Sequence, residues 1–321
     1  MIRTLLAITK ISGIADGFIK KHISVFTRNT NCEEIVNILA KESNKITPKI
    51  VSENLEWADN VIRTCNDLGI TMCPIFDKNY PHLLKEISNP PAILYLLGNT
   101  DLLNKEIIAI IGTRKSTELG NKIAHKVGTY FSQKKVLCNG LVEGIDRNSV
   151  SSENSIAKNV IGILSGGLNF HNTISKKTAS LAEEVLKNNG LLISEDEPNK
   201  KESQFSGSKS SRIQAGLSTA LLLIQSSTTG GSKYTLKTFA KLGRILGYIS
   251  FEGHEEYDHD NSFSANRLLD KEKVKGVAEI CELKQVAQVK IKKIIAIHST
   301  KEYETILQEI DSTKIERGTL F

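Results

Sequence analysis

The stretch KVLCNGLVEGID, Lys135 to Asp146, joins a short apolar run to a turn that contains two glycines and ends on an acid. A short apolar run bounded by turn residues is typical of a strand that is buried on both faces. Glycine between a strand and a helix lets the backbone approach a flat or anionic group closely. The stretch therefore predicts a buried strand, a close turn and the start of a helix.

The same order of apolar run and turn is repeated along the chain, with segments of helical periodicity between the runs. The runs are IIAII (107–111), KVLC (135–138), VIGIL (160–164), LLIS (191–194), ALLLIQ (220–225) and ILGYIS (245–250). Six such runs that alternate with helices predict an α/β protein with a mostly parallel sheet. We expect the sheet to be doubly wound, with helices on both of its faces.

The segments on either side of this region predict two smaller parts. LLAITKISGIADGFIKKHI (5–23) reads as a helical hairpin with Gly13 at the turn, and ENLEWADNVIRTCNDLG (53–69) has apolar residues up to Leu68 at helical spacing. After residue 282 we expect a strand or short helix and then an amphipathic helix, STKEYETILQEI, in a segment too short for a normal winged helix. The expected divisions are a small helical domain of SAM or helix-hairpin-helix type (1–72), an α/β domain (73–282) and a short C-terminal segment (283–321).

Composition limits the class of protein. The 321 residues include 42 Lys and Arg against 36 Asp and Glu, and the formal net charge of +6 favours an anionic partner. The five cysteines are scattered, so neither a disulfide framework nor a zinc site is expected, and no metal is assigned. The N-terminal apolar run is broken at Lys10 and no stretch approaches the length of a membrane span. We therefore expect a cytoplasmic protein without membrane contact.

The residues that follow the apolar runs are expected to carry the function, because ligands bind at the carboxyl ends of parallel strands. These segments are GTR (112–114), NGLVEGID (139–146), SGGLN (165–169), EDEP (195–198) and SSTTGGSKYT (226–235). Four of the five are rich in Gly, Ser and Thr, whose N–H and hydroxyl groups can point at phosphate oxygens. Neither GxGxxG after the first strand nor a P-loop sequence occurs, and no cofactor is expected.

The candidate phosphate contacts are taken from these segments and from a serine-rich segment further along. They are Gly112, Thr113, Arg114, Asn139, Gly140, Gly144, Ser165, Gly166, Gly167, Lys209, Ser211 and Arg212. An arginine in a tight turn at the sheet edge, such as Arg114, is typical of a phosphate ligand. Asp146 is assigned a supporting role because a carboxylate repels phosphate, and an Asp at the start of a helix is an ordinary cap. Thr235 is also assigned to support, and no catalytic residue is assigned.

The order of these segments resembles the DprA/Smf family of DNA-processing proteins. The segments that match are GTR, NGLVEGID, SGGLN, LLISE, SRIQAGLS, GGSKYTLK and GR, the last being Gly243 and Arg244. The spacing from GID to SGGLN agrees without a gap, and the resemblance covers residues 75–282. An ordered set of segments is far more specific than any one of them.

The resemblance implies an extended Rossmann-like fold and a non-enzymatic protein that binds single-stranded DNA. It also implies a homodimer that hands the strand to the recombinase RecA. The residues agree with such a ligand, because hydroxyl and N–H groups beside Arg114 and Arg212 suit a phosphate backbone, whose recognition is electrostatic and tolerant of sequence.

The chain departs from the family pattern inside the motifs. The departures are Asn139 where the family has Ser, Val142 where it has Ala, Val150 where it has His, and Ser210 and Ser211 where it has Arg and Asn. Loss of an Arg weakens nucleic-acid affinity through charge and counterion release. We therefore expect a divergent member that binds DNA more weakly or binds a different anion.

Two other classes of function stay open. Divergent DprA-like proteins also occur in toxin–antitoxin and phage-defence modules, where they restrain a toxin-like partner enzyme. Related Rossmann-like folds bind nucleotides or hydrolyse them as phosphoribohydrolases, but that chemistry needs a Glu near the position of Lys237, so hydrolysis is not expected. The loop HEEYDHD (254–260) has the residue types of a metal site, and we expect a solvated polar loop there instead.

Overall fold

The computed structural model describes the chain except for residues 28–30, 153–154, 205, 255–256, 258 and 319–321. Its central feature is a nine-stranded sheet with the order β1-β2-β8-β7-β4-β3-β9-β10-β11. The strands are β1 (Thr71–Pro74), β2 (Ile93–Gly98), β3 (Ile107–Ile111), β4 (Val136–Asn139), β7 (Val160–Ile163), β8 (Leu191–Ser194), β9 (Ala220–Leu223), β10 (Ile245–Ile249) and β11 (Lys293–Ile297). Each of the six predicted runs is a strand of this sheet.

The sheet is parallel from β8 to β11, and only the β1–β2 and β2–β8 pairs are antiparallel. All five side chains of β3 are buried, which explains why IIAII has no polar alternation. The strand order moves outward from β3 to β4, β7 and β8 and then returns to the other side of β3 with β9. Ligands of such sheets bind at this reversal, outside the carboxyl ends of β3 and β9.

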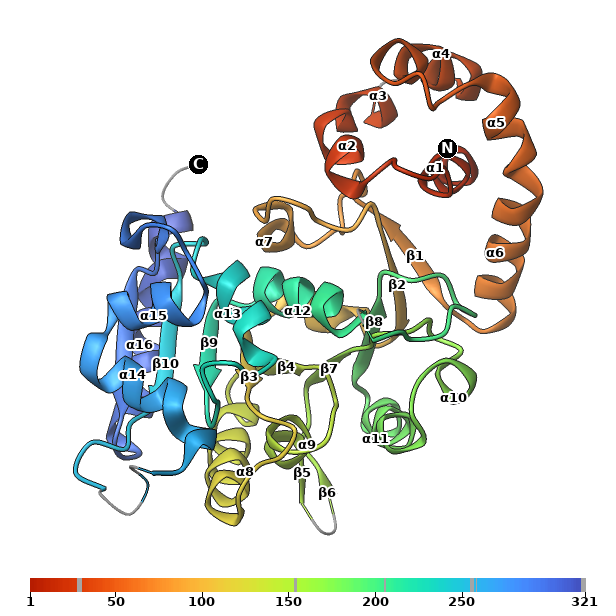
Figure 1. Cartoon of the computed structure of the whole chain (residues 1–321). Coiled ribbons are helices and arrows are strands. Elements are labelled where there is room, and N and C mark those ends of the chain that lie inside the picture. The colour runs from red at the N-terminus through yellow and green to blue at the C-terminus, as the bar shows by residue number, and fades with distance from the viewer. Residues whose placement is uncertain (28–30, 153–154, 205, 255–256, 258, 319–321) are drawn as a thin grey trace.

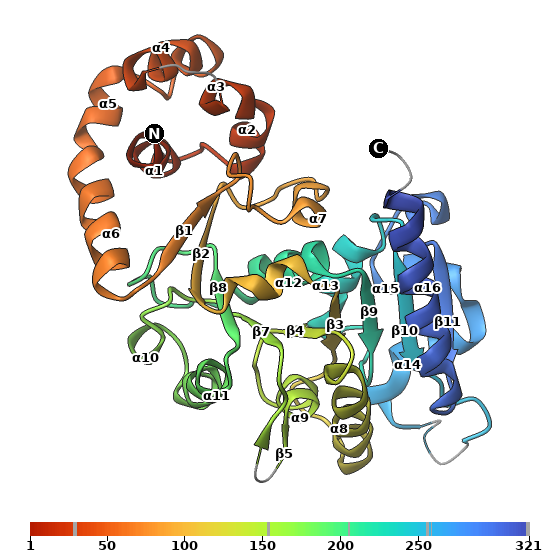
Figure 2. The same cartoon turned by 180° about the vertical axis from the view of Figure 1, so that it is seen from behind.

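Helices cover both faces, so the predicted doubly wound α/β fold is confirmed (Figures 1 and 2). One face carries α8 (Glu118–Ser132), α9 (Ile145–Val150), α11 (Lys176–Lys187) and α16 (Lys301–Gly318). The other carries α7 (His82–Lys85), α12 (Ser206–Leu217), α13 (Ser232–Phe239), α14 (Ser264–Glu272) and α15 (Val274–Ile280). The remaining short elements are α10 (Phe170–Thr173), η1 (Thr100–Asn104), η3 (Asn261–Phe263), η4 (Val286–Gln288) and the hairpin β5 (Ser151–Ser152) and β6 (Ser155–Ile156).

The N-terminal helices form an arc beside β1 and β2, in red and orange in Figure 1. They are α1 (Ile2–Thr9), α2 (Asp16–Lys21), α3 (Ile23–Thr27), α4 (Cys32–Glu42), α5 (Pro48–Glu53) and α6 (Leu55–Asp67). Gly13 lies in the turn between α1 and α2 with a φ of +82°, a conformation that favours glycine. Leu68, expected on the apolar face of α6, follows the last residue of that helix and is 39% exposed.

The arc of helices and the sheet share one continuous hydrophobic core. Two hydrogen bonds also join them, from the backbone N–H of Ala92 to Asp16 Oδ1 (3.1 Å) and from Lys20 Nζ to the carbonyl oxygen of Ile87 (2.7 Å). At the other edge of the sheet, β11 pairs with β10 and contacts α16. The expected domain boundaries at residues 72 and 282 stay a prediction. Within the described chain, no helix combines the length and apolar character that crossing a bilayer requires.

The GR segment before β10 has a structural role. Arg244 is 2% exposed and donates over 2.6–3.1 Å to the carbonyl oxygens of Leu83, Ala215, Gly216 and Ser218 and to Oε2 of Glu86. Three of these carbonyl oxygens belong to the C-terminal end of α12, where helix carbonyls have no partner within the helix. One guanidinium therefore fixes the end of α12 and ties it to α7.

We predict that Arg244→Ala lowers the free energy of unfolding by about 3 kcal/mol or more, because removal of one partner of a buried ion pair leaves the other groups uncompensated. Urea denaturation followed by circular dichroism measures the change. Arg63→Ala, at an exposed position of α6, is the matched control and should change stability by less than about 0.5 kcal/mol. Equal denaturation midpoints for the two variants would contradict the assigned role.

Candidate functional site

A cleft of about 650 Å³ lies at the carboxyl edge of the sheet, where the strand order reverses. It is bounded by the loops after β3, β4, β7 and β9 and by the first turns of α12 and α13. The lining residues are Ile111, Gly112, Thr113, Arg114, Lys115, Gly140, Val142, Asp146, Ile163, Ser165, Gln204, Gly207, Ser208, Ser210, Ser211, Gln214, Gly231, Ser232, Tyr234 and Thr235. Six of the twelve predicted contacts and both supporting residues are in this lining, and the assignment of the cleft to a ligand stays a prediction.

Two glycines of the predicted phosphate loops serve a contact between the loops themselves. Ile145 donates its backbone N–H to the carbonyl oxygen of Thr113 over 3.1 Å, which joins the loop after β4 to the loop after β3. Gly144 has a φ of +82°, and a Cβ on it would lie 2.3 Å from that same carbonyl oxygen. A Cβ on Gly112 would lie 2.4 Å from the side chain of Ile145. Gly144 is therefore corrected from a phosphate contact to a residue that lets two loops pack.

The remaining predicted residues of the loop after β4 divide between the cleft and the interior. Asn139 is fully buried, and its amide donates to the carbonyl oxygen of Asp146 and to Ser149 Oγ, each over 3.0 Å. Its Oδ1 accepts from the backbone N–H of Leu141. Asn139 therefore shapes the turn and does not reach a ligand, which corrects its assignment. Gly140 does line the cleft.

Asp146 stabilises the turn after β4 through a hydrogen bond to its backbone, in agreement with the supporting role assigned to it. Its Oδ2 accepts the backbone N–H of Gly140 over 2.9 Å. Burial raises the pKa of Asp146 to about 7, against the opposing effects of the Gly140 and Val142 N–H groups and of Arg114. The floor of the cleft thus contains a carboxyl group that changes charge near neutral pH.

The two glycines of SGGLN also pack closely against other segments of the protein. A Cβ on Gly167 would lie 2.0 Å from the carbonyl oxygen of Glu197, and a Cβ on Gly166 would lie 2.8 Å from that of Thr173. Both glycines are buried, so their assignment as phosphate contacts is corrected to close packing. Ser165 does line the cleft, where its hydroxyl donates to Glu202 Oε2 over 2.8 Å.

Arg212 connects three parts of the protein and is not available to a ligand. Its five N–H donors are all used, by the carbonyl oxygens of Asn89 and Lys209, by both carboxylate oxygens of Glu195 and by Asp16 Oδ2. The side chain is only 15% exposed. Asp16 belongs to the N-terminal helices, so the guanidinium joins that arc to α12 and to the loop after β8. The assignment of Arg212 as a phosphate contact is therefore corrected.

The cations of the cleft are Arg114 and Lys115. Both side chains are exposed, and neither has a hydrogen-bond or ion-pair partner for its charged group among the described residues. The Arg114 guanidinium extends across to α12, since a Cβ on Gly207 would lie 3.4 Å from its Nη2. Lys209 is exposed on α12 but lies outside the lining. Two unpaired cations above one buried carboxyl group make the cleft attractive to anions.

Lys115, Gln214 and Tyr234 are among the lining residues that were not assigned from the sequence. Lys115 directly follows the GTR segment but is not part of that motif. Gln214 is 7% exposed, and its side-chain amide makes no hydrogen bond with the part of the chain that the structure describes. Tyr234 is 48% exposed at the rim. The sequence feature that indicates Tyr234 is its position in GGSKYT, three residues after Gly231. Ser211 and Thr235, both predicted, line the cleft as expected.

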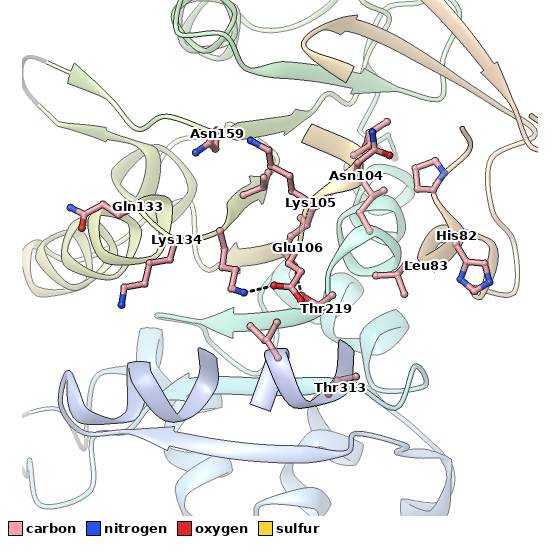
Figure 3. A pocket seen from close by; sticks show the side chains of 17 residues that line it. His82, Leu83, Asn104, Lys105, Glu106, Gln133, Lys134, Asn159, Thr219 and Thr313 are labelled. Atoms are coloured by element: carbon pink, nitrogen blue, oxygen red, sulfur yellow. Dashed lines mark hydrogen bonds and ion pairs between the residues drawn. The ribbon is translucent and has the colours of Figure 1, made fainter. Parts of the chain in front are cut away.

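A second cavity, of about 570 Å³, lies at the opposite, amino edge of the sheet (Figure 3). Most of its positive charge is compensated: Lys135 pairs with Glu106 and, over 2.8 Å, with Asp311, and Lys134 pairs with Glu304 over 3.1 Å. Lys105 also lines this cavity and has no ion-pair partner for its ammonium group among the described residues, so the amino edge has one such cation where the carboxyl edge has two. Part of the loop HEEYDHD lies outside the described residues, and the described ones bring no three His, Cys, Asp or Glu side chains together as metal ligands.

The fold and the cleft define a Rossmann-like α/β protein with a cationic, hydroxyl-rich site at the reversal of its strand order. The family model of DNA recombination-mediator protein A matches residues 71–286, and the chain belongs to this family. The resemblance seen in the motifs is thereby confirmed.

Several relatives and solved structures are similar to the chain. The DNA processing protein DprA of Bacillus subtilis is 31% identical over 186 residues, which cover 57% of this chain and 62% of that protein. The DprA of Streptococcus pneumoniae is 25% identical over 236 residues, covering 73% and 82%. The crystal structure of the latter protein matches with a TM-score of 0.67 at 20% identity, over 92% of this chain and 95% of that one. The DNA processing protein A of Helicobacter pylori, described by its single-stranded DNA binding mode, matches with a TM-score of 0.58 at 20% identity, over 74% and 96%.

We predict that Arg212→Ala loosens the attachment of the N-terminal helices, because Asp16 and Glu195 would lose the cation they share. The free energy of unfolding should fall by about 3 kcal/mol. Hydrogen exchange should rise in α2 and at the start of α12. Arg114→Ala, which removes an arginine whose guanidinium has no hydrogen-bond or ion-pair partner in the described part of the chain, is the control and should leave both measurements unchanged. Unchanged hydrogen exchange in Arg212→Ala would show that the ion pairs of Arg212 do not hold the N-terminal helices against the rest of the protein.

We predict that Asp146 makes stability depend on pH between about 4 and 8. In an unfolded chain an Asp has a pKa of about 3.9, and in the folded protein that of Asp146 is raised to about 7. The folded state therefore holds this proton more tightly, and the stability it contributes is present at low pH and lost as the pH rises through 7.

Asp146→Asn keeps an acceptor for Gly140 but cannot ionise. Relative to wild type, its free energy of unfolding should increase by about 2 kcal/mol between pH 5 and pH 8. Urea denaturation of both proteins at the two pH values measures this. A constant difference between them would refute the raised pKa.

Proposed function

We propose that this protein binds single-stranded DNA, with the phosphate backbone crossing the cleft at the carboxyl edge of the sheet. The observation that carries the proposal is that Arg114 and Lys115, whose charged groups have no partner among the described residues, lie above a surface of hydroxyl, amide and backbone N–H groups. Such a surface neutralises phosphates without reading bases, as sequence-tolerant strand binding requires. Membership of the recombination-mediator family and the DNA binding mode described for the Helicobacter relative support it.

The proposed contacts follow the geometry of the cleft. Arg114 and Lys115 supply the charge, and Gln214 supplies a side-chain amide that makes no hydrogen bond with the described residues. Thr113, Gly140, Ser165, Ser211 and Thr235 are retained from the sequence prediction as parts of the lining. Asn139, Gly166 and Gly167 are buried, and Gly144 and Arg212 are partly buried; these five residues shape the site without facing a ligand.

We propose a binding role and not an enzymatic one. Among the lining residues that the structure describes, Asp146 is the sole carboxylate, and it is occupied with the backbone N–H of Gly140. Lys237, at the position where phosphoribohydrolase chemistry needs a Glu, lies outside the lining altogether. The position that would carry the catalytic Glu of a phosphoribohydrolase is therefore not part of this cleft.

Two finer parts of the proposal rest on the family alone. We propose that the protein acts as a homodimer and that it hands the bound strand to a recombinase of the RecA type. Family membership favours both. No contact in the described chain favours the alternative in which the protein restrains a toxin-like enzyme.

We predict that Arg114→Ala weakens binding of fluorescein-labelled oligo-dT about tenfold, because one charge-assisted phosphate contact is lost. Titrations followed by fluorescence anisotropy at several salt concentrations measure the effect. The slope of log affinity against log salt should also fall by about 0.7, the value for one phosphate contact on a single strand.

Arg63→Ala removes an equal charge from the N-terminal helices and should bind like wild type. Equal binding by Arg114→Ala and wild type would overturn the site. Absence of binding by wild type at low salt would overturn the function.

A further inference from the structure

The exposed ring of Tyr234 lies where the cleft meets the surface of α13. The side chain is 48% exposed, and its hydroxyl has no hydrogen-bond partner among the described residues. Lys233 Nζ lies 5.7 Å from the ring centroid, which places a cation beside the aromatic face. A half-exposed aromatic ring at the mouth of an anionic-ligand cleft is a suitable platform for a nucleobase, since every base has a flat face.

Two lysines continue from Tyr234 along the same side of α13. Lys237 and Lys241 follow it by three and seven residues, so both project within about 60° of the tyrosine on a helical wheel. The helix ends at Phe239, but Ala240 keeps a helical backbone, which carries this direction to Lys241. The distance from Tyr234 to Lys241 along the axis is about 10 Å.

The surface around Lys237 and Lys241 carries a net positive charge. Lys233 is paired with Glu282 over 2.7 Å. Lys237 and Lys241 form no salt bridge or hydrogen bond through their ammonium groups within the described chain. Both act on the same buried thiol: burial raises the pKa of Cys281 to about 12, and the two ammonium groups oppose that rise. The lysines are therefore neighbours in space, on the surface that α13 shares with α15.

We propose that Tyr234, Lys237 and Lys241 form an exit track along α13, on which a single strand leaving the cleft stacks a base on Tyr234 and places its following phosphates against the two lysines. This inference rests on the proposed function, because it extends the path of the same strand. The track is continuous with the cleft, since Tyr234 lines both, and its charge is complementary to phosphate.

The track predicts different effects for its aromatic and cationic parts. Tyr234→Ala should weaken binding of an oligo-dT of about 12 nucleotides by about fivefold to a hundredfold, the range for one base stacked on an aromatic side chain. Tyr234→Phe keeps the ring and should retain the affinity. The double variant Lys237→Gln, Lys241→Gln should reduce the salt slope by about 1.4, for two phosphate contacts on a single strand.

An abasic oligonucleotide of the same length separates stacking from charge. On it, Tyr234→Ala should bind like wild type, while the double lysine variant should still show its reduced salt slope. Arg63→Ala serves again as the control for loss of a distant charge. Because all three track residues are on the surface, thermal melts of the variants should match wild type, and titrations are compared only after this check.

The outcomes distinguish failure of the track from failure of the proposed function. If wild type binds oligo-dT and Arg114→Ala weakens it, but the Tyr234 and lysine variants bind normally, the track is refuted and the cleft stands. An equal effect of Tyr234→Ala on dT and abasic strands would also refute stacking. Absence of binding by wild type would remove the function on which the track depends.

Discussion

The candidate site depends on one contact, the hydrogen bond from the N–H of Ile145 to the carbonyl oxygen of Thr113. It locks the loop after β4 against the loop after β3, and Thr113 in turn donates its N–H to the carbonyl oxygen of Gln225 after β9 over 2.7 Å. Three loops from adjacent strands are thus held as one unit. Only residues without a Cβ allow this approach, as the space around Gly112 and Gly144 shows. The protein's own hydrogen bonds therefore hold the loops of the cleft floor together without a ligand, which reduces the entropy that binding must overcome.

The arginines of this chain show how burial decides between structure and binding. Arg212 and Arg244 are surrounded by acceptors and hold elements together, whereas the guanidinium of Arg114 faces solvent and has no acceptor among the residues that the structure describes. A saturated guanidinium would have to leave carboxylates and carbonyl oxygens behind in order to reach a phosphate. The anion-binding capacity of the carboxyl edge therefore comes from a few short loop residues, not from the arginines of the family motifs as a group.

Much of the fold could be predicted from the sequence, because strands such as β3 are buried on both faces and read as unbroken apolar runs. The position of the cleft followed from the same runs. The sequence could not predict which residues, distant along the chain, each side chain would contact in the folded protein. Arg212 pairs with Asp16, which lies 196 residues away, and no local pattern reports such a pair. Gly144 has the residue type and the position expected in a phosphate-binding loop. The group that lies closest to it, however, is the carbonyl oxygen of Thr113. Tyr234 stands in a segment noted for its glycines, and its exposure depends on how α13 packs.

The carboxyl group of Asp146 beneath the cleft couples two equilibria. With a pKa of about 7, it is neither fully charged nor fully neutral under ordinary conditions. An anion above it favours the neutral form, so occupancy of the cleft by phosphate would be accompanied by uptake of a proton. By the same linkage, acidification would tighten the hold on an anionic ligand and alkaline conditions would release it. The residue that shapes the turn would then also make the protein's affinity respond to the proton concentration around it.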